Sequence, residues 1–137
     1  MAKTLTLEGD VNAIDTRVQL TGQGSVTAPS RVVPSGVSRI DKIAVVAAAD
    51  GLADGGGVLF LRLGGSAVLG GEQTICIGGH GRIAVQAGSD AAPNLGSHLM
   101  IENTDIEVRP GDVINVEAEM AGVDMGDTSV AVTLFWA

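Results

Sequence analysis

The sequence has very few aromatic side chains: one tryptophan, two phenylalanines and no tyrosine in 137 residues. Carbohydrate-binding faces and single-strand nucleic-acid platforms stack their ligands on exposed aromatic rings. Phe60, Phe135 and Trp136 all lie within apolar, strand-like segments, so we expect them in the core or at an interface. The composition therefore disfavours a carbohydrate-binding module.

Basic residues are also scarce. The chain has 8 Lys and Arg against 16 Asp and Glu, a net charge of −8. Residues 43–137 alone hold three basic and twelve acidic residues, or −9. Binding to nucleic acid depends on Lys and Arg that neutralise phosphates, and anionic membrane surfaces attract basic segments. We therefore expect neither a nucleic-acid partner nor a membrane partner.

Cysteine and long hydrophobic runs are nearly absent. A single cysteine, Cys76, excludes a disulfide within the chain, and its apolar neighbours predict a small buried side chain. The longest apolar run, Ile43 to Ala49, is far shorter than the roughly 20 residues that span a bilayer. No secretory signal pattern follows the first residues, so we expect synthesis in a cytosol.

The sequence contains no recognisable catalytic motif. Gly79–Ala84 fits a loose dinucleotide-binding fingerprint, but the following residues alternate like a strand, whereas that fingerprint requires a helix. The two histidines, His80 and His98, are eighteen residues apart and lack further ligands of metal-binding spacing. We predict no catalytic residue, no cofactor and no metal site.

Two glycine-rich loops leave one alternative open. Asp50 and Asp54 lie in one loop, and Asp124 and Asp127 lie in the other. Calcium takes oxygen ligands from such loops. Aspartate also forms turns without any ion, and neither loop has EF-hand spacing, so the sequence does not decide between these roles.

The residues that are abundant favour strands. Val, Ile and Thr number 17, 9 and 9, and β-branched side chains suit a pleated sheet. Apolar runs recur from Val37 onward, each closed by Gly, Asp, Asn or Pro, at the spacing of a sandwich or barrel. The eight candidate strands are Val37–Ala49, Val58–Leu63, Glu72–Ile77, Arg82–Ala87, His98–Glu102, Asp105–Val108, Asp112–Met120 and Thr128–Trp136.

Alternation is clearest in the last two candidates. Asp112–Met120 places apolar and acidic residues on opposite faces, which predicts one face in the core and one in water. Its predicted inward residues are Ile114, Val116, Ala118 and Met120. In Thr128–Trp136 the predicted inward residues are Val130, Val132, Leu134 and Trp136. We expect these two strands to form a long hairpin with each other.

The first 36 residues differ from the rest. They hold short alternating pieces around Leu5 and Val18, separated by glycine and proline. We interpret residues 1–36 as an extended N-terminal arm with short strands, and residues 37–137 as a domain that folds without it. The predicted fold class is all-β: an eight-stranded antiparallel jelly-roll sandwich with an extended arm.

Two strands have no polar face apart from Arg62. Ile43–Ala49 and Val58–Leu63 are apolar on both sides, so each is covered by the arm, by another subunit or by a loop over a central strand. We expect the arm and these strands to pair within a subunit or across to a neighbour. The predicted oligomer interface consists of Leu5, Leu7, Val18, Leu20, Ile43, Val45, Val46, Leu59 and Leu61.

The segment Val108–Ile114 contains the turn Pro110-Gly111-Asp112 and resembles the turn common in jelly rolls. The whole chain is similar in architecture to small jelly-roll virion proteins: capsid proteins and head-decoration proteins of tailed phages and archaeal viruses. This resemblance implies a non-enzymatic virion structural protein, decoration or cement rather than DNA-lining because of its acidity. Its partners would be further copies of itself, as a trimer, and a capsid shell protein.

Two other classes stay open. A cupin-like enzyme or small-molecule binder shares the turn, but cupins follow it with metal-binding histidines, and the residues after Asp112 up to Met120 include none. A trimeric recognition module like those of the TNF and C1q families is the third possibility. Bound metal distinguishes the second class from the other two.

Overall fold

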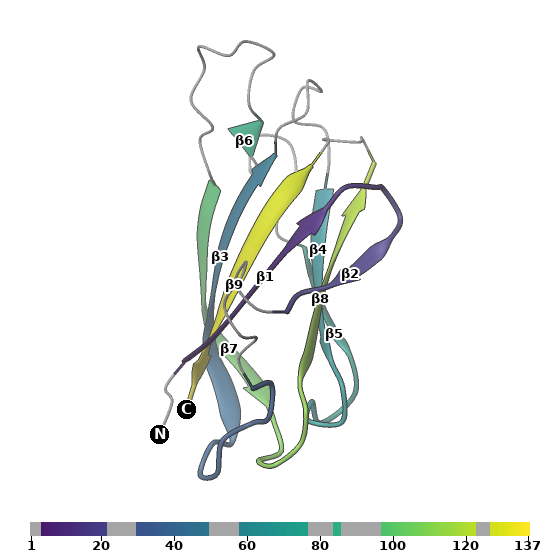
Figure 1. Ribbon diagram of the computed structural model, residues 1–137. Helices are drawn as coiled ribbons and strands as arrows, with labels where there is room; N and C mark the ends of the chain where they lie inside the picture. The colour runs from purple at the N-terminus through teal and green to yellow at the C-terminus, as the bar shows by residue number, and fades with distance from the viewer. Residues whose placement is uncertain (1–3, 22–29, 50–57, 77–83, 86–96, 123–126) are drawn as a thin grey trace.

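The computed structural model describes residues 4–21, 30–49, 58–76, 84–85, 97–122 and 127–137, and every regular element in them is a strand (Figure 1). The nine strands are β1 (Thr4–Val11), β2 (Arg17–Gln19), β3 (Arg39–Ala49), β4 (Val58–Gly64), β5 (Gln73–Cys76), β6 (Ala84–Val85), β7 (Ser97–Glu107), β8 (Asn115–Ala121) and β9 (Thr128–Trp136).

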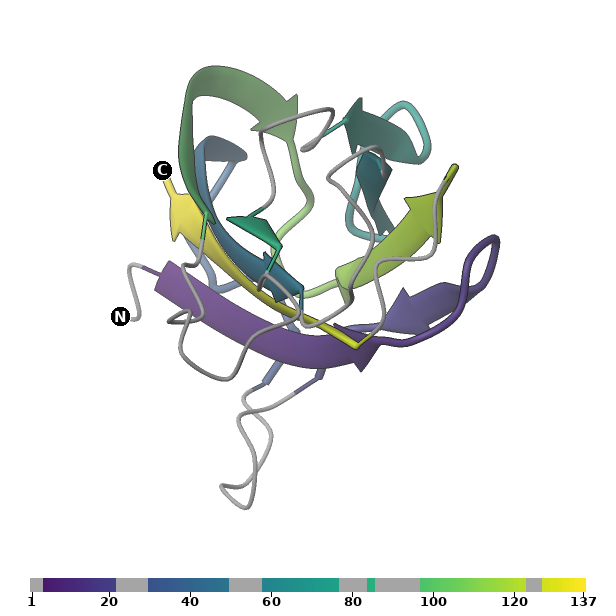
Figure 2. The ribbon, with the colours of Figure 1, turned by 90° about the horizontal axis from the view of Figure 1, so that it is seen from above.

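The strands form two sheets that pack face to face (Figure 2). One sheet has the order β1-β9-β3, with β7 on the far side of β3 and the short β6 pairing in parallel with the end of β3. The other has the order β2-β8-β4-β5. Four antiparallel pairs, β1·β9, β2·β8, β3·β7 and β4·β5, nest inside one another along the chain. This nesting is the jelly roll that the sequence predicts.

The core lies between the two sheets and is built from the alternation of each strand. On β8 and at the residue before it, the predicted inward residues Ile114, Val116, Ala118 and Met120 are all fully buried, which confirms that prediction. On β9 the residues Val130, Val132 and Leu134 are buried, and Trp136 is partly buried against them. Each large aliphatic side chain removed from water contributes roughly 1.5–3 kcal/mol to stability.

The predicted hairpin between the last two strands is wrong. β8 pairs with β2 and β4, whereas β9 pairs with β1 and β3, so the chain crosses from one sheet to the other between them. Alternation determines which side chains face inward, but it carries no information about which strand lies alongside. The two strands face each other across the core instead of sharing hydrogen bonds.

The boundary predicted at residue 36 does not separate an arm from a core. β1 pairs with β9 over eight residues, from Thr4–Phe135 to Val11–Thr128. Leu5, Leu7 and Val11 are buried in the same cluster as the later strands. The first residues therefore supply an edge strand to each sheet, and the eight jelly-roll strands include β1 and β2.

A glycine makes room where β1 turns towards β2. Gly9 occupies an inward position on β1, and a Cβ there would lie 2.8 Å from Leu20 Cδ2. The fully buried Leu20 fills that space from the end of β2. The absence of a side chain at residue 9 thus allows Leu20 to pack directly against the backbone of β1.

Two predicted strands, His98–Glu102 and Asp105–Val108, are one strand, β7. Asn103 and Asp105 have φ of 54° and 48°, and the register against β3 shifts between Ile40 and Lys42. Asn and Asp tolerate positive φ better than most residues. The strand therefore continues past Asn103 and Asp105 with a β-bulge, where the sequence suggests a turn between two strands.

Candidate functional site

The residues predicted to form an oligomer interface lie mostly inside this chain. Seven of the nine have at most 5% of their surface exposed: Leu5, Leu7, Leu20, Ile43, Val45, Leu59 and Leu61. Val18 is partly buried against the same core. Such side chains offer no surface to a second copy, so their predicted role is corrected to a place in the core of a single chain. Only Val46, 38% exposed, lies on the surface.

The two apolar strands are thus covered from within. β3 lies between β9 and β7, and β4 lies between β8 and β5. The described part of the arm does not pair with either of them, because β1 pairs with β9 and β2 with β8. Of the alternatives for a strand with no polar face, the structure shows a central strand.

The outer face of the β2-β8-β4-β5 sheet, which we call the charged face, is covered by paired polar side chains. Arg62 donates hydrogen bonds to Glu119 Oε1 from Nη2 at 2.6 Å and from Nε at 3.1 Å. A third hydrogen bond from Arg62 reaches Thr74 Oγ1 at 3.0 Å, and its guanidinium carbon lies 5.7 Å from the ring centre of Phe60. Arg62 therefore ties three strands together across this face.

A second group on the charged face lies nearer its β2 edge. Arg17 donates to Glu72 Oε2 at 3.0 Å and lies 3.8 Å from Glu117 Oε1. Asn115 Oδ1 accepts hydrogen bonds from Gln19 and from Arg31. Among the described residues, the charges of this face are largely used in contacts within the chain.

The outer face of the β1-β9-β3-β7 sheet has a different surface. We call it the smooth face and define it by Thr6, Ser129, Ala131, Thr133, Ala44, Val46 and Met100. The strand register places these side chains in rows across the sheet, such as Thr6–Thr133–Ala44–Met100. Most are small and uncharged, and Met100 is 51% exposed. Glu8 and Asp10 lie on the edge strand β1 beside Ala131 and Ser129, whereas Lys42 lies on β3 between Phe135 and Glu102.

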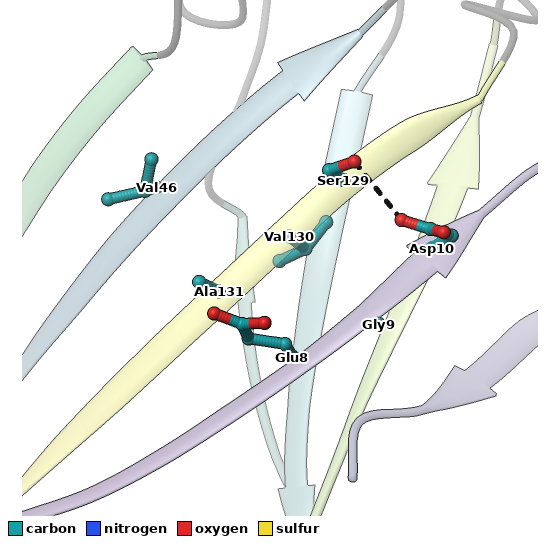
Figure 3. A pocket seen from close by; sticks show the side chains of 7 residues that line it. All are labelled: Glu8, Gly9, Asp10, Val46, Ser129, Val130 and Ala131. Carbon is teal, nitrogen blue, oxygen red and sulfur yellow. Dashed lines mark hydrogen bonds between the residues drawn. The ribbon is translucent and has the colours of Figure 1, made fainter. Parts of the chain in front are cut away.

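A shallow groove of about 220 Å³ runs along β9 on the smooth face (Figure 3). Ser129 and Ala131 form its floor, because they are short side chains at successive outward positions of β9. Val46 of β3 stands on one side, and Glu8 and Asp10 of β1 stand on the other. The groove exists because a strand with short side chains lies between two strands with longer ones.

The groove has an apolar wall and an acidic wall. The Glu8 side chain extends from β1 towards Ala131 (Figure 3). Asp10 Oδ1 accepts a hydrogen bond from the Ser129 hydroxyl at 3.1 Å, which fixes the carboxylate at the rim. Among the described residues, neither Lys nor Arg lines the groove. The arrangement suits a ligand group with an apolar stem and a positive end.

The other residues that the sequence singles out are placed as follows. Cys76 is exposed at the edge strand β5, so the prediction of a buried thiol is wrong. His80, Asp50, Asp54 and Asp124 lie outside the described residues, as does the side chain of His98. Within the part of the chain that the structure describes, no group of three or more His, Cys, Asp or Glu side chains is placed to hold a metal ion. The described residues also contain no helix long and apolar enough to cross a membrane.

Sequence reasoning missed Glu8, Asp10 and the short residues of β9 as a common site. They are about 120 positions apart in the sequence, and only the pairing of the first strand with the last brings them together. A signal was present in the outward positions of the last strand, where Ser129, Ala131 and Thr133 are all small. Small, uncharged outward residues on a solvent-facing strand indicate a surface that something can approach closely.

No family model matches the sequence, and no curated protein gives a significant match. Solved structures match it at low similarity. The subviral particle of infectious bursal disease virus VP2 is 13% identical with a TM-score of 0.35, over 96% of this chain and 32% of that one. The T=1 particles derived from infectious bursal virus give 18% identity and a TM-score of 0.33, over 95% and 32%.

A carbohydrate-binding module from the family 9 glycoside hydrolase Cel9A of Ruminococcus flavefaciens matches similarly. It is 12% identical with a TM-score of 0.37, over 96% of this chain and 98% of that one. The chain spans about a third of the length of the viral protein. These values show a weak likeness to viral capsid and carbohydrate-binding structures and carry no argument about function, which must come from the chain's own surface.

Proposed function

We propose that the chain is a non-enzymatic structural protein of a virion, which decorates or cements a capsid by binding the shell with the smooth face. The observation that carries the proposal is the smooth face itself. It presents small, uncharged side chains on β1, β9 and β3, with Val46 exposed among them and Met100 exposed beside them on the edge strand β7. Large exposed apolar patches mark interaction surfaces more often than single exposed residues do.

The jelly roll supports this role without determining it. Jelly-roll sandwiches build viral capsid proteins, but they also build lectin domains and cupins, so the fold alone does not give the function. The acidity of the chain adds a second argument. A net charge of −8 suits the outside of a particle better than a surface in contact with packed DNA.

The proposal includes self-association, with a trimer as the expected state. The smooth face is assigned to the shell, so the copies would associate with each other through other surfaces. Light scattering of the purified protein measures the oligomer number, and a strictly monomeric protein that never joins a particle would contradict this part.

The test is whether the chain belongs to a particle. Antibodies against the purified protein should label the outside of intact virus particles from the source culture. Mass spectrometry of the same particles should find the chain in a fixed ratio to the main shell protein. Finding the chain only in the particle-free fraction would overturn the proposal.

A further inference from the structure

The groove on the smooth face has a chemistry more specific than the flat surface around it. Its floor is Ser129 and Ala131, its apolar wall is Val46, and its acidic wall is Glu8 with Asp10. We propose that this groove receives a lysine or arginine side chain of an extended segment of the partner protein. The inference deepens the proposed function, and it rests on that function only in taking the partner to be a shell protein.

The shape of the groove selects an extended segment. Ser129 and Ala131 are two residues apart on one strand, so their side chains are about 7 Å apart along it. A partner strand laid along β9 presents every second side chain to the groove at the same spacing. A helix, about 10–12 Å across with its side chains, is too wide for a groove with a floor one strand wide.

The walls select the side chain. Lys and Arg carry an aliphatic stem below a charged head, and they commonly bury the stem against apolar surface while the head stays polar. Val46 and Ala131 offer contact to the stem, and the Glu8 and Asp10 carboxylates lie where the head would arrive. Within the described residues, Asp10 makes no ion pair, and its hydrogen bond comes from the neutral Ser129 hydroxyl.

Charge complementarity also argues against a second copy as the occupant. The chain carries −8 overall, and the described charged side chains of this face include Glu8, Asp10 and Glu102 against Lys42. Two such faces brought together would place like charges near each other, which costs affinity. A basic segment from another protein meets the same carboxylates favourably.

The probe for this proposal is a short extended peptide, acetyl-Thr-Val-Lys-Val-Thr-amide, added to the isotope-labelled full chain. The matched peptides carry norleucine, which keeps the stem without the charge, or glutamate in place of lysine. Amide signals of Glu8, Asp10, Val46, Ser129 and Ala131 should shift in a saturable way with the lysine peptide. The norleucine and glutamate peptides should bind at least about fivefold more weakly, as expected for loss of exposed charge pairs.

Two double variants distinguish the contribution of the groove's carboxylates from that of the overall negative charge. Glu8→Gln with Asp10→Asn removes the acidic wall, and Asp15→Asn with Glu107→Gln removes two exposed acidic residues elsewhere, giving the same net charge. Asparagine suits residue 15, where φ is 56°. The first pair should weaken lysine-peptide binding about fivefold, and the second should change it by less than about half as much.

A third variant tests the shape. Ala131→Leu fills the floor of the groove from an outward position and should abolish saturable binding, whereas Ala121→Leu, outward on β8, should leave it unchanged. Equal binding of all three peptides, shifts centred on the charged face or equal effects of the two double variants would each overturn the proposal. Because the peptide assay uses no virus particle, it can fail while the chain is still found in virions, and the reverse also holds.

Discussion

The charged face and the smooth face lie on opposite sides of one sandwich, and their side chains are used differently. On the charged face, Arg62 bonds to Glu119 and Thr74, and Arg17 to Glu72. On the smooth face, the described side chains that hydrogen-bond to each other include Thr6 with Thr133 and Ser129 with Asp10. The first face uses its polar groups within the chain, and the second leaves small side chains open to a partner.

This difference indicates on which face amino-acid substitutions cost little stability. Replacing a paired charge leaves its partner without a hydrogen bond, so the charged face is constrained by stability. Replacing a small outward residue on the smooth face removes few contacts, so that face is constrained by what binds to it. The predictions below test this division, beginning with the largest expected effect.

The largest effect is expected when one edge strand is removed from each sheet. We predict that deletion of residues 2–30 abolishes folding, because it removes the buried Leu5, Leu7, Val11 and Leu20. Each contributes roughly 1.5–3 kcal/mol, against a total stability of about 5–15 kcal/mol for a typical domain. Circular dichroism and a thermal melt measure the result. A cooperative melt with full strand content would show that residues 37–137 fold alone, as the sequence suggests.

A milder change compares the partly buried ion pair of the charged face with an exposed ion pair. Arg62→Ala should lower the free energy of unfolding by about 1–3 kcal/mol, because Glu119 loses its charged partner at a site where both side chains are at most 20% exposed. Arg39→Ala is the matched control, since Arg39 and Asp105 are 49% and 75% exposed, and it should cost less than about 1 kcal/mol. Urea unfolding measures both. Equal costs would remove the special role given to the Arg62 group.

The side-chain hydrogen bond on the smooth face between Thr6 and Thr133 should matter less. Thr133→Val keeps the shape and removes the 2.9 Å contact between Thr6 Oγ1 and Thr133 Oγ1, at an expected cost below about 1 kcal/mol. Thr6→Val should cost the same, and the double variant should cost no more than about the larger single value, because both remove one bond. A cost above that of Arg62→Ala would reverse the comparison between the faces.

The smallest effect on stability, with the clearest effect on docking, is expected at Met100, on the edge strand β7 of the smooth face. Met100→Lys should change the free energy of unfolding by less than about 0.5 kcal/mol, because the side chain is half exposed. It should sharply reduce the number of copies bound per particle. Gln73→Lys, exposed on β5 of the other sheet, adds the same charge and should leave the copy number unchanged. Equal loss by both variants would mean that charge alone governs binding.

The sequence predicted the fold class and the inward residues better than it predicted the neighbours of each strand. The alternation from Ile114 to Met120 identified four buried residues correctly, because a strand with one wet face has a period of two. It could not show that β8 and β9 belong to different sheets, since either partner satisfies the same alternation. The exposed Cys76 was missed for a related reason: its neighbours are apolar, but its strand lies at an edge.

The site was harder to predict than the fold. Leu5 and Leu20 were assigned to an interface because the first segment lacks enough apolar residues for a core of its own. The structure instead places them in the core formed by the later strands. The groove depends on the contact of Glu8 and Asp10 with a strand more than a hundred residues later, and no local pattern predicts such a contact.

The most direct test of the central claim is hydroxyl-radical footprinting of the chain free and bound to its particle. Met100 lies on the smooth face and is 51% exposed, Phe60 lies on the charged face and is partly exposed, and Met120 is fully buried. We predict that binding lowers the oxidation of Met100 severalfold, leaves that of Phe60 unchanged, and leaves Met120 protected in both states. Protection of Phe60 with full oxidation of Met100 would show that the chain docks by the charged face and would contradict the account.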